Sequence, residues 1–455
     1  MSPHFSKDAD FNRRDFLKGS STATLMTMLG GVRVLAQSTE PGDQEKKPVG
    51  PPVKVGVIGL GTWGRTILST LGTLPEAQIA AICDTYPASL NRCASAAPGA
   101  QQTPDYRAVL NNPDIPAVII ATPTHQHKEI VLAALGAGKH VYCEAPIAHT
   151  VEDARSIALA AKAARQLVFQ SGLQLRSDPQ RLELIRTFRT GALGKPVMAR
   201  AQWHKKQSWR AASPKPEREK ELNWRLDKSL SLGLMGEIVS HLMDQATWFL
   251  DQQPVAVSGA GTVASWDDGR EVPDTARLVL EFPGTFFMYC DATLANSFAG
   301  EYEIYYGNES AVLLRQSDIW LFKEVDARLL GWEVYFPKQQ ILDETGIILK
   351  VGASKSVSAD QQPTEKAEPP KTPLSCALTV FLANARDLVA AREDYLKLIS
   401  DDPEGLVEHL ATRVPRRPAP GYLEGFRAAV TAIQANEAIR TGQRVVLKPE
   451  WYEVS

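Results

Sequence analysis

The residues best suited to chemistry begin with a glycine-rich turn. An apolar run at 53–58 ends in GLGTWG at 59–64, which matches G-x-G-x-x-G, and a second apolar run at 79–83 ends in Asp84. In such a turn the first glycine permits a tight bend, the second lets a pyrophosphate approach the backbone, and the third lets the next helix pack on the strand. The pattern therefore predicts a dinucleotide site.

The charge at the end of the second run indicates which dinucleotide binds. A carboxylate at Asp84 can accept hydrogen bonds from both ribose hydroxyls and would repel a 2′-phosphate, which favours NAD over NADP. The positive N-terminus of the helix after the turn faces the phosphates. The residues that we expect to bind NAD lie where successive strands end: Gly59, Gly61, Thr62, Trp63, Gly64, Asp84, Thr122, Pro123, His127 and Glu144.

Strands and helices alternate around these residues. Apolar runs at 118–121, 140–143 and 167–170 are separated by helical segments at 128–137 and 151–165. This alternation predicts an α/β domain with a doubly wound parallel sheet, in which ligands bind at the carboxyl ends of the strands. His125, His127 and Glu144 would then lie beside the cofactor. A histidine at a strand end often only hydrogen-bonds its own loop, so both roles stay open for His127.

The pattern changes after residue 172. Expected strands follow one another without intervening helices, at 197–203, 255–263, 275–282, 285–292 and 302–307. They predict an α+β domain with a largely antiparallel open sheet, and Pro283-Gly284 reads as a hairpin turn. Helices at 374–391 and 423–441 are expected to pack back against one of the sheets.

The first fifty residues suit an export signal followed by a linker. Arg13-Arg14 precede a weakly apolar stretch at 19–34, which resembles a twin-arginine export signal with Asn12 in place of Ser or Thr. A disordered arm with a chance arginine pair is the alternative. The expected segments are a signal peptide at 1–36, a linker at 37–52, an NAD-binding domain at 53–172 and a substrate domain at 173–455, with a flexible surface loop at 351–373.

Composition excludes several classes of protein. The chain has 50 Lys+Arg against 52 Asp+Glu, so it has no basic excess for nucleic acid. Its hydrophobic fraction of 44% is that of an ordinary globular protein. No apolar run reaches the roughly 18 uncharged residues of a membrane span, so we expect no stable membrane insertion. The five cysteines are scattered and form neither a disulfide framework nor a zinc pattern.

Several motifs together resemble the glucose–fructose oxidoreductase / inositol dehydrogenase / MocA (Gfo/Idh/MocA) family. They are GLGTWG at 59–64, ATPTHQH at 121–127, AGKHVYCEAP at 137–146, the segment 236–244, and the closing helix and strand from 421 onward. The resemblance runs from about residue 53 to 446. It implies NAD-dependent transfer of hydride from a sugar or polyol hydroxyl, and a homo-oligomer formed through the open face of the second sheet.

Within this resemblance, the expected helix 236–250 carries the chemistry. Glu237, His241 and Asp244 lie at i, i+4 and i+7, so they share one helix face. An imidazole titrates near neutrality and suits a group that takes a proton from a hydroxyl as hydride leaves its carbon. His241 and Glu237 are therefore the expected catalytic residues. The alternatives are a histidine hydrogen-bonded in a domain interface and a metal site, which the lack of H-E-x-x-H and of nearby thiolates disfavours.

Side chains that bind hydroxyls or stack on a sugar ring are the expected substrate contacts: Arg176, Lys205, Trp224 and Asp244. Two positions depart from the family pattern. The catalytic lysine of E-K-P is Ala145, which cannot transfer protons, and the Asp four residues before the catalytic histidine is Glu237. Lys205 or Lys206 could replace the missing lysine, although an exposed charge pair at a strand end is the simpler interpretation.

Three functions remain open. The first is an exported oxidoreductase, periplasmic or otherwise carried out by the twin-arginine machinery, that holds NAD tightly and oxidises a sugar or polyol. The second is a redox-neutral NAD-dependent glycosidase of the same superfamily, which oxidises, eliminates and re-adds. The third is a non-catalytic NAD-binding homologue, suggested by Ala145 alone. An exported enzyme has no pool of free NADH, so any hydride that it removes must be returned locally.

Overall fold

The computed structural model describes residues 50–213, 215–315, 318–341, 343–349, 371–399 and 402–454. Three sequence-based expectations fall wholly or mostly outside these described residues. They are the signal peptide at 1–36, the linker at 37–52 except for its last three residues, and the surface loop at 351–373 up to residue 370.

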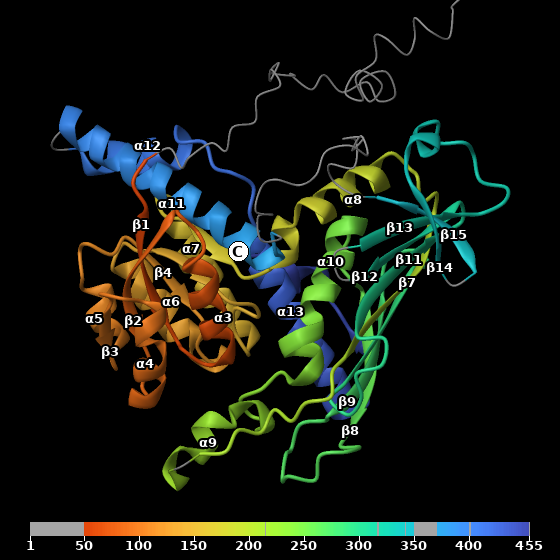
Figure 1. Ribbon diagram of the computed structural model, residues 1–455, viewed down its shortest axis with the longest axis horizontal. Coiled ribbons are helices and arrows are strands. Elements are labelled where there is room, and N and C mark those ends of the chain that lie inside the picture. Colours follow the sequence, from red (N-terminus) through yellow and green to blue (C-terminus); the bar gives the residue numbers. More distant parts are fainter. Residues whose placement is uncertain are drawn as a thin grey trace, which may run out of the picture. The chain divides into compact units, whose positions relative to one another are not determined.

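Six strands form a parallel sheet in the order β3-β2-β1-β4-β5-β6 (Figure 1). The strands are β1 (Val53–Ile58), β2 (Ala77–Cys83), β3 (Gln101–Thr103), β4 (Ala117–Ile120), β5 (His140–Cys143) and β6 (Phe169–Ser171). The helices between them are α3 (Thr62–Leu71), α4 (Pro87–Cys93), α5 (Tyr106–Leu110), α6 (His127–Gly136) and α7 (Val151–Ala163). The predicted doubly wound sheet is confirmed. Because the strand order reverses between β1 and β4, the carboxyl ends of these two strands are where sheets of this kind bind their ligands.

Ten strands form the second sheet, in the order β14-β15-β13-β12-β11-β7-β10-β9-β8-β16. They are β7 (Pro196–His204), β8 (Ala256–Thr262), β9 (Thr275–Glu281), β10 (Phe287–Thr293), β11 (Glu301–Gly307), β12 (Ser310–Arg315), β13 (Asp318–Lys323), β14 (Lys338–Ile341), β15 (Glu344–Ile348) and β16 (Val445–Val446). Among the pairs, β7 and β10 run parallel and the others antiparallel. The predicted largely antiparallel sheet is confirmed, β16 is the expected closing strand, and the sequence analysis missed β12 to β15.

The helix expected at 236–250 separates β7 and β8, as a π-helical turn at Met235–Val239 followed by α10 (Ser240–Leu250). The sequence analysis missed α9 (Glu219–Leu222) in the same interval and α8 (Pro179–Arg189) before β7. These helices cover one face of the second sheet because strands β7, β9 and β10 alternate buried and exposed residues. The polar arm at 205–230 that leads to the π-helical turn has few apolar residues to mark its short helices.

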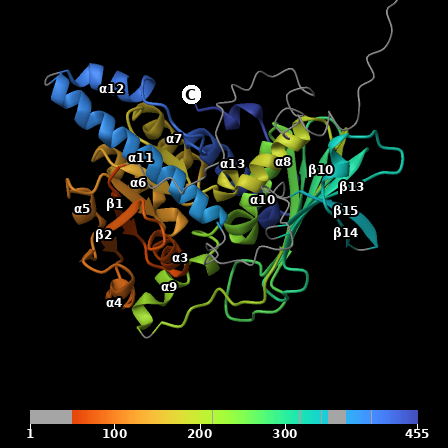
Figure 2. The ribbon, with the colours of Figure 1, turned by 45° about the horizontal axis from the view of Figure 1, so that its top comes forward.

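A long apolar helix returns to the first sheet. Helix α11 (Pro373–Leu398) places Leu378, Phe381 and Ala385 in one core cluster with residues of β1 and α3, and α12 (Pro403–Thr412) adds Leu410 (Figure 2). By length and composition alone α11 could cross a membrane, but 50% of its most apolar window is buried. A core helix passes the same test. The sequence criterion missed it because Arg386 and Asp387 interrupt the uncharged run.

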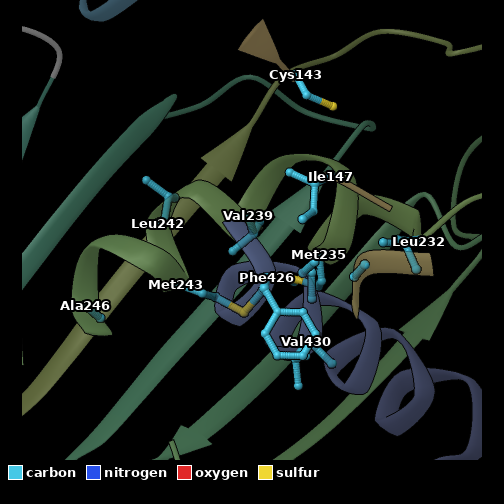
Figure 3. Close-up of a cluster of buried hydrophobic side chains, with 14 of the residues drawn as sticks. Cys143, Ile147, Leu232, Met235, Val239, Leu242, Met243, Ala246, Phe426 and Val430 are labelled. Carbon is cyan, nitrogen blue, oxygen red and sulfur yellow. The ribbon is translucent and has the colours of Figure 1, made fainter. Parts of the chain in front are cut away.

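Helix α13 (Tyr422–Thr441) joins the two sheets. Figure 3 shows the Phe426 ring among Met235, Val239 and Met243, with Ile147 of the loop after β5 beside them. Phe426 is fully buried, and α13 also packs against α7 and β8. The loop after β5 and the π-helical turn thus share one apolar core, which holds the end of the first sheet against the helical layer of the second.

Candidate active site

The glycine-rich turn has the geometry that a dinucleotide needs. Gly59 has φ +95°, and a Cβ there would lie 2.6 Å from the carbonyl oxygen of Ala121. A Cβ on Gly64 would collide with the carbonyl oxygen of Gly59, so only glycine allows α3 to approach β1. A Cβ on Gly61 would meet no atom of the described residues within 4 Å. Gly61 is the N-cap of α3 and gives no side-chain cap, so the N–H groups of the first turn, such as those of Thr62 and Trp63, are of the kind that binds phosphate.

Asp84 lies at the carboxyl end of β2, beside this turn. Its two carboxylate oxygens accept hydrogen bonds from the backbone N–H groups of Leu60 and Tyr86, both at 2.8 Å. The carboxylate is half-buried and keeps free lone pairs, so it can also accept from a ribose. The second domain reaches this end of the site, because Thr85 Oγ1 donates to Glu221 Oε1 at 3.0 Å and the Arg218 guanidinium lies 4.4 Å from the Tyr86 ring centroid.

The loop after β4 is held by the His127 ring. His127 is buried, with Nδ1 3.1 Å from the Pro146 carbonyl oxygen and Nε2 2.9 Å from the Thr122 carbonyl oxygen. Burial lowers the pKa of His127 to about 4, so the ring is neutral near pH 7. Both ring nitrogens face backbone, which favours the loop-bonding role over direct contact with a ligand. Thr122 Oγ1 is buried without a partner among the described residues, so it remains available to a cofactor, and Pro123 starts the next turn.

Glu144, at the carboxyl end of β5, is a buried carboxyl group. Burial raises its pKa from 4.5 to about 7, and hydrogen bonds from Trp63 and the Ala145 backbone offset part of the rise. Its Oε1 atom has no hydrogen-bond partner in the described part of the chain. Together with the open space at Gly61, the unpartnered oxygens of Thr122 and Glu144 show that the residues present fit a dinucleotide.

The π-helical turn carries Glu237 to the loop after β4. Glu237 Oε2 accepts a hydrogen bond from Thr124 Oγ1 at 2.9 Å, and Oε1 accepts one from the backbone N–H of Leu232 at 3.1 Å. Burial raises the pKa of Glu237, and the Arg225 guanidinium opposes the rise. Glu237 lies in the five-residue π-helical turn, and His241 and Asp244 lie in the α-helix that follows it, so the single α-helix expected at 236–250 is a π-helical turn joined to an α-helix.

His241 lies in the first turn of α10. Its side chain is half-buried, and its Nδ1 makes no hydrogen bond to the described residues. Burial lowers the pKa of His241, while Asp244 opposes this effect. The ring is therefore neutral near pH 7 and able to accept a proton.

The four expected substrate contacts are placed differently. Arg176 and Asp244 bind each other through two hydrogen bonds of 2.8 Å, in the fork geometry of a buried ion pair. Trp224 is buried, with its ring 4.5 Å from the Arg225 guanidinium and 5.8 Å from the His125 ring. Lys205 is exposed at the end of β7. Trp224 thus lies where the two domains meet, whereas the backbone N–H of Lys205 bonds the carbonyl oxygen of Thr293 in the second sheet.

Two residues here were missed by sequence reasoning. The His149 ring lies 6.1 Å from the His125 ring, and Arg225 is stacked near two indoles, those of Trp224 and Trp209. His149 stands in a loop, where no periodicity marks a side chain as inward. Its only signal is its position five residues after Glu144, at the end of the same strand.

Replacing Asp84 by Ala should weaken NAD binding at least about tenfold, because it removes charge-assisted hydrogen bonds to the ribose. Asp84→Asn keeps one acceptor oxygen and should lose less. Calorimetric titration with NAD measures both affinities, and Asp114→Ala, at an exposed carboxylate of the same domain, is the matched control. Unchanged affinity in Asp84→Ala would remove this residue from the site.

Glu144 should make stability depend on pH. Its folded pKa of about 7 exceeds the unfolded value near 4.5, so between these values the folded state keeps a proton that the unfolded state releases. The free energy of unfolding should therefore fall as pH rises from about 4.5 to about 7. Glu144→Gln should flatten this part of the curve in urea unfolding of the nucleotide-free protein, and Glu450→Gln, at an exposed site, should not. Parallel curves for wild type and Glu144→Gln would contradict the assignment.

Comparison with known proteins follows the two sheets. Residues 53–171 match the model of the oxidoreductase family NAD-binding Rossmann fold (GFO_IDH_MocA), and residues 181–312 match the GFO/IDH/MocA C-terminal domain. Levoglucosan dehydrogenase of Pseudarthrobacter phenanthrenivorans is 34% identical over 151 residues, which are 33% of this chain and 37% of the relative. Inositol 2-dehydrogenase of Acidothermus cellulolyticus is 34% identical over 148 residues, 32% of this chain and 43% of the relative. The chain thus matches less than half the length of these curated relatives.

Solved structures share the fold over a longer span. Levoglucosan dehydrogenase in complex with NADH and L-sorbose superposes with a TM-score of 0.63 at 20% identity, covering 87% of this chain and 99% of that one. Aldose-aldose oxidoreductase from Caulobacter crescentus, complexed with glycerol, superposes with a TM-score of 0.60 at 20% identity. The match covers 87% of this chain and 100% of that one. Both family models lie in order along the chain and together match more than half of it. The chain belongs to the Gfo/Idh/MocA oxidoreductase family, and its first domain is the family's NAD-binding Rossmann domain.

Proposed function

We propose that the protein is an exported oxidoreductase that holds NAD tightly and oxidises a hydroxyl group of a sugar or polyol. The hydrogen bond from Thr124 to Glu237 carries this proposal. It joins the loop after β4, at the edge where NAD binds, to the π-helical turn that precedes α10, the helix of His241. This contact supports a proton acceptor of the second domain beside the dinucleotide site.

The residues divide the work of an alcohol oxidation between them. Bound NAD supplies the hydride acceptor. Neutral His241 takes the proton of the hydroxyl as the carbonyl forms, and Asp244 stabilises the imidazolium that results. Arg176 holds the Asp244 carboxylate in place through its two hydrogen bonds. Glu237, fixed by Thr124, positions the start of α10.

The names of the relatives support a polyhydroxylated substrate. The matched dehydrogenases are named for levoglucosan and inositol, and the structures of similar fold contain L-sorbose or glycerol. Trp224 offers an indole at the domain boundary, and an aromatic face suits the C–H face of a sugar ring.

Export and assembly belong to the same proposal. The arginine pair Arg13-Arg14 supports passage through the twin-arginine machinery, which carries folded proteins with their cofactor loaded. The proposed location is therefore the periplasm or another exported compartment. Outside the cytoplasm, NADH is not replenished, so the enzyme would oxidise one substrate and reduce another with the same bound nucleotide. Side chains such as Phe287, Tyr289 and Val197 lie exposed on the second sheet, which supports a homo-oligomer through that face.

Ala145 favours a second candidate, a redox-neutral glycosidase that uses the same NAD. Its methyl side chain supplies no proton donor between Glu144 and Pro146. In this reaction the hydride leaves one carbon, the acidified neighbouring proton is lost, the glycosidic group is eliminated, and the steps reverse with water. Glycoside cleavage without an added electron acceptor would favour it. A protein that binds NAD and turns over nothing in a panel of sugars and glycosides would instead be a non-catalytic homologue.

The central test is the variant His241→Ala, assayed with a panel of sugars and polyols against the absorbance of the bound nicotinamide. Turnover should fall at least about 100-fold, because a positioned acid or base contributes this much or more. Bound NAD, measured after denaturation, should stay at the wild-type level. His409→Ala, on α12, is the control and should match the wild type. Wild-type turnover in His241→Ala would overturn the catalytic assignment.

A further inference from the structure

Two histidine rings at the domain boundary have no hydrogen-bonding task within the described chain. His125 lies in the turn after β4, and His149 lies in the loop between β5 and α7. Their ring centroids are 6.1 Å apart with planes at 79°. Nδ1 of each ring is enclosed and unpartnered, and no described residue bonds Nε2, so Nε2 is the nitrogen that a ligand can approach. Each ring therefore has a nitrogen, Nε2, that can exchange a hydrogen bond with a bound molecule.

The pair lies where the cofactor edge meets the second domain. His125 directly follows Thr124, whose hydroxyl binds Glu237, and its other side packs against Trp224 at 5.8 Å. His149 follows Glu144 in the same loop after β5. Ile147, between them, packs against the π-helical turn in the cluster of Figure 3. Residues of both domains therefore surround the two rings.

The surroundings keep both rings neutral. Burial lowers the pKa of His125 and of His149. The charged groups that face them are Asp227 near His125 and Asp153 near His149, and Asp153 is already bound to Lys128 at 2.7 Å. A neutral imidazole has one N–H donor and one acceptor nitrogen. Two such rings can together donate one hydrogen bond and accept another.

The spacing suits one oxygen atom between the rings. Two hydrogen bonds of about 2.8 Å to the same oxygen hold the two nitrogens roughly 4.5 Å apart, which is compatible with ring centroids at 6.1 Å. A hydroxyl group matches the pair chemically, since it donates one hydrogen bond and accepts another. An amine cation or a carboxylate matches less well, because the first only donates and the second only accepts.

We propose that His125 and His149 form a subsite that binds one substrate hydroxyl, separate from the hydroxyl that is oxidised, with Trp224 beside it. The substrate class is then a polyhydroxylated ring or polyol, and simple alcohols are excluded. The proposal rests on the proposed function for the identity of the reacting hydroxyl. It assigns specificity to residues that lie outside the helix of His241.

The test compares the best substrate of the panel with its monodeoxy analogues, each of which lacks one hydroxyl. In the wild type, one analogue should lose about 100-fold in kcat/KM, because removing that hydroxyl leaves the Nε2 atoms of both histidines without their hydrogen-bond partner. In His149→Ala and in His125→Gln the parent should fall to the level of that analogue, while the analogue itself changes less than threefold. The other analogues should keep their wild-type ratios to the parent.

A binding measurement separates this proposal from the proposed function. Calorimetric titration of the NAD-loaded protein with the same polyols measures their binding affinity, which does not depend on turnover. Weaker binding of the parent polyol to His149→Ala than to the wild type, with unchanged NAD content and unchanged Tm, supports the subsite. This holds even if the wild type turns over no substrate, because a lack of turnover would overturn the proposed function alone. His409→Ala is the matched control, since His409 also packs against an aromatic ring but lies on α12. The proposal would be overturned if the deoxy analogue still had a kcat/KM about 100-fold below that of the parent in both histidine variants. Equal polyol affinity of the wild type and His149→Ala would overturn it as well.

Discussion

The hydrogen bond between Thr124 and Glu237 is the contact on which the rest of the site depends. Thr124 belongs to the loop that the parallel sheet places at its carboxyl edge, and Glu237 belongs to the π-helical turn before α10. Because both partners are buried, the loss of either would leave a polar group unpaired in the interior. The contact thus fixes the distance between the cofactor edge and the helix of His241. The apolar cluster around Phe426 supports the same junction from the side of the core.

Buried carboxyl groups give this junction its chemical character. Glu144 and Glu237 are both enclosed, and burial raises the pKa of each. Neither is paired with a cation by a direct salt bridge among the described residues. Burial lowers the pKa of His125, His149 and His241, because it disfavours the charged form of an imidazole. Near pH 7 the site therefore holds neutral imidazoles that can exchange hydrogen bonds and protons with hydroxyl groups. A site of this kind suits uncharged, polyhydroxylated molecules.

Much of the first domain could be predicted from the sequence because its elements repeat at short range. The turn at 59–64 and the carboxylate at Asp84 follow from spacing, and the alternation of strands and helices predicts the parallel sheet. The π-helical turn could not be predicted, since an α-helix and a π-helix place similar residues inward. Gly236 is the residue that this turn requires in the sequence, because a Cβ there would collide with the Leu232 side chain. The His125–His149 pair depends on two loops meeting in space, and no periodicity in sequence encodes that meeting.

The most direct test of the account is transfer of hydrogen from substrate to cofactor within a single enzyme molecule. Purified protein, without added nucleotide, would be mixed with a polyol deuterated at its carbinol carbons, then denatured, and the released nucleotide would be analysed by mass. The account predicts that the nucleotide released after exposure to substrate is the reduced form, NADH, with one deuterium at C4 of its nicotinamide ring. Release of NADH without deuterium, release of oxidised NAD alone after every polyol tested, or no released nucleotide would contradict it.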